Sequence, residues 1–131
     1  MSTLDVQTLL NVQTLKSNTA NTPPVIQDAN GTQVGTLCRA WVKITTGGSN
    51  PSIAAGFNVS SVTYLSVGNW RVTFTNAMPT SNFSGFVTLD GNWNITPSIL
   101  SQTTTTANLI VRLNGSGGGY NPDFLYVGFF A

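Results

Sequence analysis

Residues 37–79 read LCRAWVKITTGGSNPSIAAGFNVSSVTYLSVGNWRVTFTNAMP, and this stretch decides the fold class. Near its end, Trp70, Val72 and Phe74 alternate with polar residues. Because successive side chains of a β-strand point to opposite faces, this period of two gives the strand one apolar and one polar face. The stretch therefore predicts a half-buried sheet that serves as a scaffold or a binding surface.

Turn signals divide the remainder of the chain into short strands. Asn30-Gly31 and Asp90-Gly91-Asn92 are typical of hairpin turns. The expected strands are 25–26, 33–44, 53–64, 70–75, 83–89, 93–95, 106–113 and 124–130. A series of about seven or eight short strands predicts an all-β chain that folds as an antiparallel β-sandwich or barrel.

The N-terminal segment differs from the rest. Residues 4–15 repeat Val-Gln-Thr-Leu at an even spacing, which suits an extended chain, and residues 16–24, KSNTANTPP, have the composition of a linker. We therefore expect an arm and linker at 1–24 and a β-sandwich domain at 25–131. The arm would pair with a partner, with a neighbouring copy or with its own domain. Its apolar residues are Leu4, Val6, Leu9, Leu10, Val12 and Leu15.

Charge is scarce in this chain of 131 residues, which is the length of one domain. Only 7% of the residues are charged and the net charge is +1, against about 25% charged residues in an ordinary soluble domain. With so little charge, we expect weak electrostatic attraction to nucleic acid or to anionic membranes. The apolar run at 124–131 is too short to span a bilayer. We expect a chain made in the cytoplasm without membrane insertion, which associates with copies of itself.

The usual catalytic groups are missing from the sequence. It has no His and no Glu, so a Ser-His-Asp or Cys-His unit cannot form, and its four Asp residues lie beside turns or in the arm. The lone Cys38 excludes an intrachain disulfide and predicts a buried thiol, with an interchain disulfide as the alternative. We predict that the protein is not an enzyme and has no catalytic, cofactor or metal site.

Aromatic residues are the remaining candidates for contacts. Trp41, Trp70 and Phe74 lie in alternating strands and are expected in the core. Trp93 and Tyr120 lie near turns, where their rings could stack on a sugar or on a partner protein.

Three motifs in order resemble a module of tailed-phage virion proteins, particularly tail-fibre proteins. They are RAWV at 39–42, FNVSSVT at 57–63 and WRVTFTNAMP at 70–79, and the resemblance covers about half of the chain, best over residues 28–83. This sequence has Trp70 where the pattern of the family usually has Tyr. The resemblance implies a structural role in the virion without an enzymatic site, in a trimer whose N-terminal arm lies near the attachment end. It carries over no receptor-binding residues.

The leading hypothesis is accordingly a non-enzymatic phage structural protein, a short tail fibre or fibre head, trimeric and attached to other virion proteins through its arm. Its loops would contact the host surface, including host glycans. One alternative is a capsid decoration or cement protein, which would be present in many more copies per particle. A carbohydrate-binding module is a further alternative, and a depolymerase is the last.

Overall fold

The structure of the protein is a computed structural model that describes residues 14–19, 24–90 and 94–131. Leu15, at the end of the predicted arm, is 65% exposed. Trp93, a predicted contact residue, lies outside the described residues. So do the other apolar residues assigned to the arm, namely Leu4, Val6, Leu9, Leu10 and Val12.

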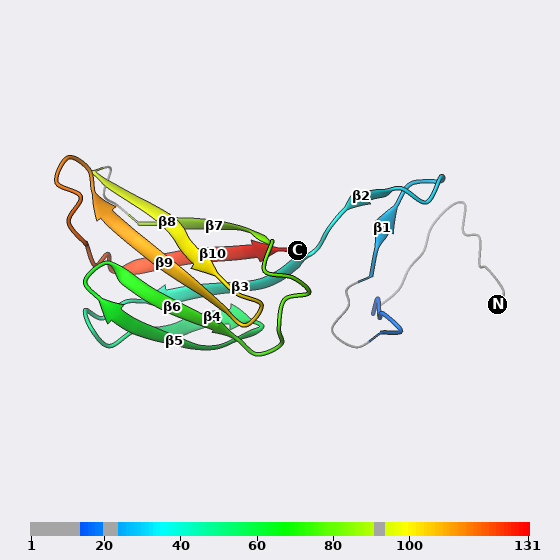
Figure 1. The fold of residues 1–131 in the computed structure, drawn as a ribbon. Helices are drawn as coiled ribbons and strands as arrows, with labels where there is room; N and C mark the ends of the chain where they lie inside the picture. Colours follow the sequence, from blue (N-terminus) through cyan, green and yellow to red (C-terminus); the bar gives the residue numbers. More distant parts are fainter. Residues whose placement is uncertain (1–13, 20–23, 91–93) are drawn as a thin grey trace.

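The described part of the chain is entirely β-structure and turns, without a helix that could cross a membrane. It contains ten strands: β1 (Ile26–Gln27), β2 (Gln33–Gly35), β3 (Cys38–Thr45), β4 (Ser52–Phe57), β5 (Val59–Ser66), β6 (Asn69–Phe74), β7 (Ser84–Leu89), β8 (Ile95–Gln102), β9 (Thr106–Leu113) and β10 (Phe124–Phe130). Two four-stranded antiparallel sheets, ordered β4-β3-β10-β7 and β5-β6-β9-β8, pack face to face (Figure 1). The predicted β-sandwich is confirmed.

Four central strands build the core because every second side chain points inward. The inward residues are at most 5% exposed: Ala40, Val42 and Ile44 in β3, Trp70, Val72 and Phe74 in β6, Ala107, Leu109 and Val111 in β9, and Leu125, Val127 and Phe129 in β10. The rings of Phe74 and Phe129, from opposite sheets, meet edge to face with centroids 5.1 Å apart. Both also contact the ring of Phe83, each at 5.7 Å. The core positions predicted for Trp70 and Phe74 are confirmed.

Asn58 carries the chain from one sheet to the other between β4 and β5. Its φ of 56° lies in the left-handed region, which Asn tolerates better than most residues. Its Nδ2 donates to the carbonyl oxygens of Arg39 (3.0 Å) and Asn76 (3.1 Å), and its Oδ1 accepts from the Asn76 N–H at 2.7 Å. One side chain therefore fixes the corner to β3 and to the loop that follows β6.

Three expected strands have clearly different limits in the structure. The predicted strand 53–64 is broken at Asn58, and the predicted strand 33–44 is divided into β2 and β3. Of the predicted strand 93–95, Ile95 is the first residue of β8, which continues through Pro97 to Gln102. Pro97 has no backbone N–H to donate. It is tolerated in β8 because this strand lies at the edge of the sheet and is hydrogen-bonded to β9 on one side only.

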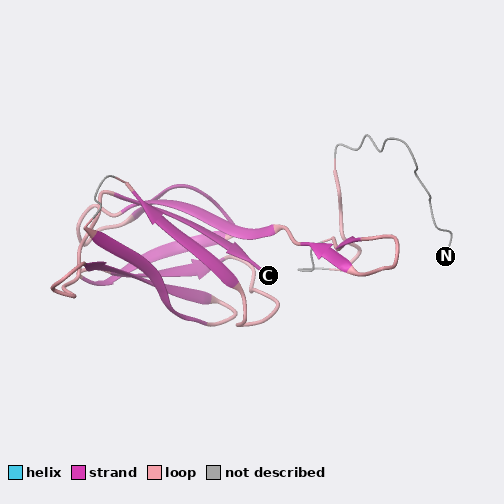
Figure 2. Ribbon diagram, turned by 90° about the horizontal axis from the view of Figure 1, so that it is seen from above, coloured by secondary structure: helices cyan, strands magenta, loops and turns pink. Residues whose placement is uncertain are grey.

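The first two strands form a sheet of their own, separate from the sandwich. Figures 1 and 2 show this β1–β2 hairpin projecting beyond the end of the sandwich at which β10 finishes. The Thr36 hydroxyl donates to the carbonyl oxygen of Ala131 at 2.8 Å and ties the hairpin to that end. The sandwich itself thus begins at Cys38, later than the domain start expected at Val25.

The projecting hairpin has a well-formed turn but little apolar burial. Asp28 Oδ1 accepts from the N–H groups of Asn30 and Thr32, both at 2.9 Å. By contrast, Val25 is 56% exposed, Ile26 41% and Val34 62%. An isolated two-stranded hairpin is marginal in water. The β1–β2 hairpin therefore has the properties of a segment that packs against another surface.

Replacing Asn58 tests the corner. We expect Asn58→Ala to lower the free energy of unfolding by about 2–4 kcal/mol, because it loses three hydrogen bonds and places Ala at a positive φ. Asn58→Gly, which accepts that φ, should lose less. Urea unfolding followed by fluorescence measures both, and an Asn58→Ala variant as stable as the wild type would contradict the assigned role.

Gly68, in the β5–β6 turn, has a φ of 74°, and a Cβ there would collide with the carbonyl oxygen of Val111. Gly48 has a similar φ of 68° but nothing within 4 Å of its Cβ position. We therefore expect Gly68→Ala to cost about 3 kcal/mol or more and Gly48→Ala about 1 kcal/mol. Equal losses in thermal unfolding would show that the close approach to β9 is unimportant.

Candidate functional site

The outer face of the β4-β3-β10-β7 sheet is the most unusual surface of the described chain. Since the inward residues of β3 and β10 occupy alternate positions, the residues between them must point outward. In β3 these include Trp41, which is 43% exposed, and Lys43. In β10 they include Tyr126, which is 39% exposed, and Gly128. The fold therefore places aromatic rings on a solvent-facing side.

The register of the sheet aligns these residues in rows across all four strands. Trp41 pairs with Phe57 of β4 and Gly128 of β10, and Gly128 pairs in turn with Phe86 of β7. Because Gly128 has no side chain, the row has a gap between two aromatic residues. This gap is part of a shallow depression of about 370 Å³, lined by Trp41, Val42, Lys43, Ala55, Phe86, Thr88, Tyr126, Val127 and Gly128. We call the outward-pointing residues of this set, which exclude the core residues Val42 and Val127, together with Phe57, the aromatic face.

The aromatic face presents rings and very little charge. The Lys43 ammonium lies 4.7 Å from the ring centroid of Phe124 and 5.4 Å from that of Tyr126, within the range of a cation–π interaction. No carboxylate is present among the residues that line the depression. The exposed ring of Phe86 is supported by Phe130, which it meets edge to face at 5.9 Å. The face is thus suited to an apolar partner rather than a charged one.

The prediction that Trp41 lies in the core is wrong. Ala40 and Val42 on either side of it are buried, and the period of two then requires Trp41 to point outward. The alternation of RAWV contained this signal, but the size and apolar character of Trp41 had favoured burial. Phe57, Phe86 and Tyr126 were also missed, because nothing in their local sequence shows that the sheet register brings them together.

Tyr120 is not an exposed contact residue of a loop tip. It is partly buried against the core, and its N–H donates to the carbonyl oxygen of Val111 at 3.2 Å. The neighbouring Gly119 lies so close to Val67 that a Cβ would collide with the Val67 carbonyl oxygen. This part of the glycine-rich loop is therefore packed onto the β5–β6 turn, and Tyr120 has a structural position.

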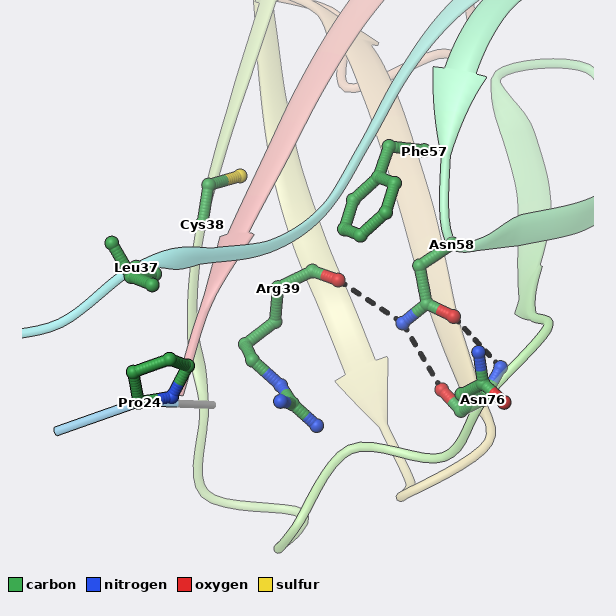
Figure 3. A pocket seen from close by; sticks show the side chains of 7 residues that line it. All are labelled: Pro24, Leu37, Cys38, Arg39, Phe57, Asn58 and Asn76. Atoms are coloured by element: carbon green, nitrogen blue, oxygen red, sulfur yellow. Dashed lines mark hydrogen bonds between the residues drawn. The ribbon is translucent and has the colours of Figure 1, made fainter. Parts of the chain in front are cut away.

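A second pocket lies where the N-terminal segment joins the sandwich (Figure 3). The Asn58 amide in its wall is already hydrogen-bonded to Arg39 and Asn76 (Figure 3). The Cys38 thiol, expected to be buried, is partly exposed and donates to the carbonyl oxygen of Ala40 at 3.2 Å. The pocket has a volume of about 270 Å³ and is lined by Pro24, Leu37, Cys38, Arg39, Phe57, Asn58 and Asn76.

Two of the described aspartates, Asp28 and Asp90, accept backbone hydrogen bonds through their carboxylates. Asp28 caps the β1–β2 turn, as predicted, and Asp90 Oδ1 accepts from the N–H of Phe124 at 3.3 Å. Among the described residues no three of His, Cys, Asp and Glu gather as a metal site would require.

Comparisons with protein-family models, with curated proteins and with solved structures gave no significant match. The function is therefore inferred from the residues and geometry of this chain.

Trp41 and Phe86 should contribute little to folding if they belong to a surface. We expect Trp41→Thr/Phe86→Thr to lower the free energy of unfolding by no more than about 2 kcal/mol, because both rings are already half exposed and Thr suits a strand. In contrast, Val42→Ala and Val127→Ala together should cost about 3 kcal/mol or more, because they leave cavities in the core. Chemical denaturation at a concentration where the chain is monomeric compares the two variants. A larger loss in the surface variant would contradict its assignment.

Proposed function

We propose that this protein is a non-enzymatic structural subunit of a phage virion, a short tail fibre or fibre head that assembles as a trimer. The observation that carries the proposal is the large amount of apolar surface outside the core, on the β1–β2 hairpin and on the aromatic face. A chain with 7% charged residues and such surfaces is suited to assembly. The resemblance of its RAWV, FNVSSVT and WRVTFTNAMP motifs to tail-fibre modules supports the virion as the place of assembly.

The polarity of the fold also supports this proposal. The β1–β2 hairpin lies at one end of the sandwich, while the loops after β3 and β9 lie at the other (Figure 1). Asn121 links the loops of this far end, because its Oδ1 accepts from the N–H of Gly68 at 2.8 Å and its Nδ2 donates to the carbonyl oxygen of Gly48 at 3.5 Å. A subunit with an attachment segment at one end and braced loops at the other has the organisation of a fibre head.

In this proposal the arm docks onto other virion proteins by strand addition or intertwining. Its docking residues are Leu4, Val6, Leu9, Leu10, Val12 and Leu15. The loops 47–51 and 115–121 lie at the outward end, and they contact the host surface through their exposed residues, which are 115–118 in the second loop.

Deletion of residues 1–16 tests the attachment role. We expect the truncated chain to keep the circular dichroism spectrum and cooperative unfolding of the sandwich, because the core residues of the described chain begin at Ala40, but to be absent from purified particles. Quantitative mass spectrometry of particles assembled with truncated or full-length chain measures incorporation and copy number. Unimpaired incorporation would refute docking through the arm, and a copy number typical of a capsid decoration protein would move the subunit from the tail to the head.

A further inference from the structure

We infer that the aromatic face of the β4-β3-β10-β7 sheet packs against a second copy of this chain. The inference rests on the proposed function, since it names the surface through which an oligomeric virion subunit would assemble. Its centre is the row of Trp41, Gly128 and Phe86.

The two outer faces of the sandwich differ in a way that singles out this one. On the β5-β6-β9-β8 sheet, Arg71 Nε donates to Asn108 Oδ1 at 3.1 Å, and Asn108 Nδ2 donates to Ser101 Oγ at 2.9 Å. A polar network thus links three strands of that sheet, although Leu65 and Leu100 are exposed on its edge strands. The central strands of the aromatic face carry Trp41 and Tyr126 instead. The contrast is that aromatic rings gather in the middle of one outer face, where the other has hydrogen-bonded polar side chains.

The exposed aromatic area has the size of an interface core. Trp41 is 43% exposed, Phe57 57%, Phe86 66% and Tyr126 39%. At about 200 Å² for an aromatic side chain, these fractions leave about 400 Å² of ring surface in water. A standard interface buries about 800 Å² per partner, with an apolar centre inside a polar rim. The aromatic face therefore supplies about half of such an interface, and the polar side chains around it would supply the rim.

The chemistry of the face favours a copy of this chain over a sugar. Sugar binding combines ring stacking with several hydrogen bonds, often to carboxylate or amide side chains. The depression is lined by no carboxylate or amide side chain, and its polar groups are those of Lys43 and Thr88, the Trp41 indole N–H and the Tyr126 hydroxyl. Lys43 already lies over two rings of its own subunit. A partner must therefore be apolar and nearly uncharged at the contact. Another copy meets this requirement, and a net charge of +1 gives the copies little mutual repulsion.

Gly128 allows this inference to be tested with a single side chain. A Cβ at Gly128 would have the Phe130 ring as its nearest neighbour at 3.5 Å, an ordinary contact, so the subunit itself can accept a side chain there. Gly128→Glu would place a carboxylate in the middle of the aromatic face. Gly118→Glu is the matched control. A Cβ at Gly118 would have Ser116 Oγ as its nearest neighbour at 3.5 Å, also an ordinary contact, and the substitution changes the net charge by the same amount away from the aromatic face.

Sedimentation velocity of the full-length chain at micromolar concentration is the experiment. We expect the wild type and Gly118→Glu to sediment as the same oligomer and Gly128→Glu to sediment as a monomer, with a dissociation constant raised at least about 100-fold, since a carboxylate would be desolvated among aromatic rings and would fill the depression that the partner occupies. Thermal unfolding of each variant checks that the subunit is folded. A Gly128→Glu variant that keeps the wild-type oligomer would overturn the inference and leave the proposed function intact, with assembly through the arm or the β1–β2 hairpin. A monomeric wild type would overturn both this inference and the trimer.

A second pair of variants covers the case in which Gly128→Glu does not fold. Trp41→Thr/Phe86→Thr removes rings from the aromatic face, while Leu65→Thr/Leu100→Thr removes side chains with exposed fractions of 43% and 61% from the opposite sheet. Dissociation of the first variant alone supports the inference, and equal behaviour of the two overturns it. Titration of the wild type with soluble host polysaccharide tests whether a glycan, and not a second copy of the chain, binds to the aromatic face. Binding that is lost in Trp41→Thr/Phe86→Thr but kept in the control would assign the face to a glycan and overturn the inference.

Discussion

The alternation of side chains along the four central strands is the constraint on which the rest of the molecule depends. β3, β6, β9 and β10 each place every second residue in a core shared by two sheets. This requirement also fixes the residues that point outward. Burial of Ala40 and Val42 forces Trp41 into water, and burial of Leu125 and Val127 does the same to Tyr126. The core therefore determines which positions point outward on this sheet. It does not determine which side chains occupy them, so these side chains can be suited to assembly.

The period of two could be read from the sequence wherever apolar and polar residues alternate clearly. The limits of β9 and β10 follow from it at 106–113 and 124–130, as does the core position of Trp70. It could not reveal that Asn58 breaks a long apolar stretch, because that break depends on hydrogen bonds to Arg39 and Asn76, which are distant in sequence. Nor could it reveal the aromatic face, which is assembled from four strands by the sheet register. The local pattern indicates which face of its strand a residue occupies. The pairing of strands distant in sequence determines which side chains become neighbours on that face.

The molecule has three regions with different tasks in this account. The β1–β2 hairpin extends from one end of the sandwich (Figures 1 and 2), the loops linked by Asn121 lie at the other end, and the aromatic face is the outer side of the β4-β3-β10-β7 sheet. The arrangement allows attachment, self-assembly and outward contact to occur at separate surfaces. In the proposed assembly, the apolar groups that the single chain leaves exposed would be covered when copies associate, which would stabilise the folded subunit.

The most direct test of the central claim is an experimental structure of the wild-type protein in its assembled state, by crystallography or by electron microscopy of the particle. The account predicts that Trp41 and Phe86 are buried between copies of the chain and that the depression at Gly128 is filled by a neighbouring subunit. An assembly in which these rings face solvent, with the copies joined elsewhere, would contradict it.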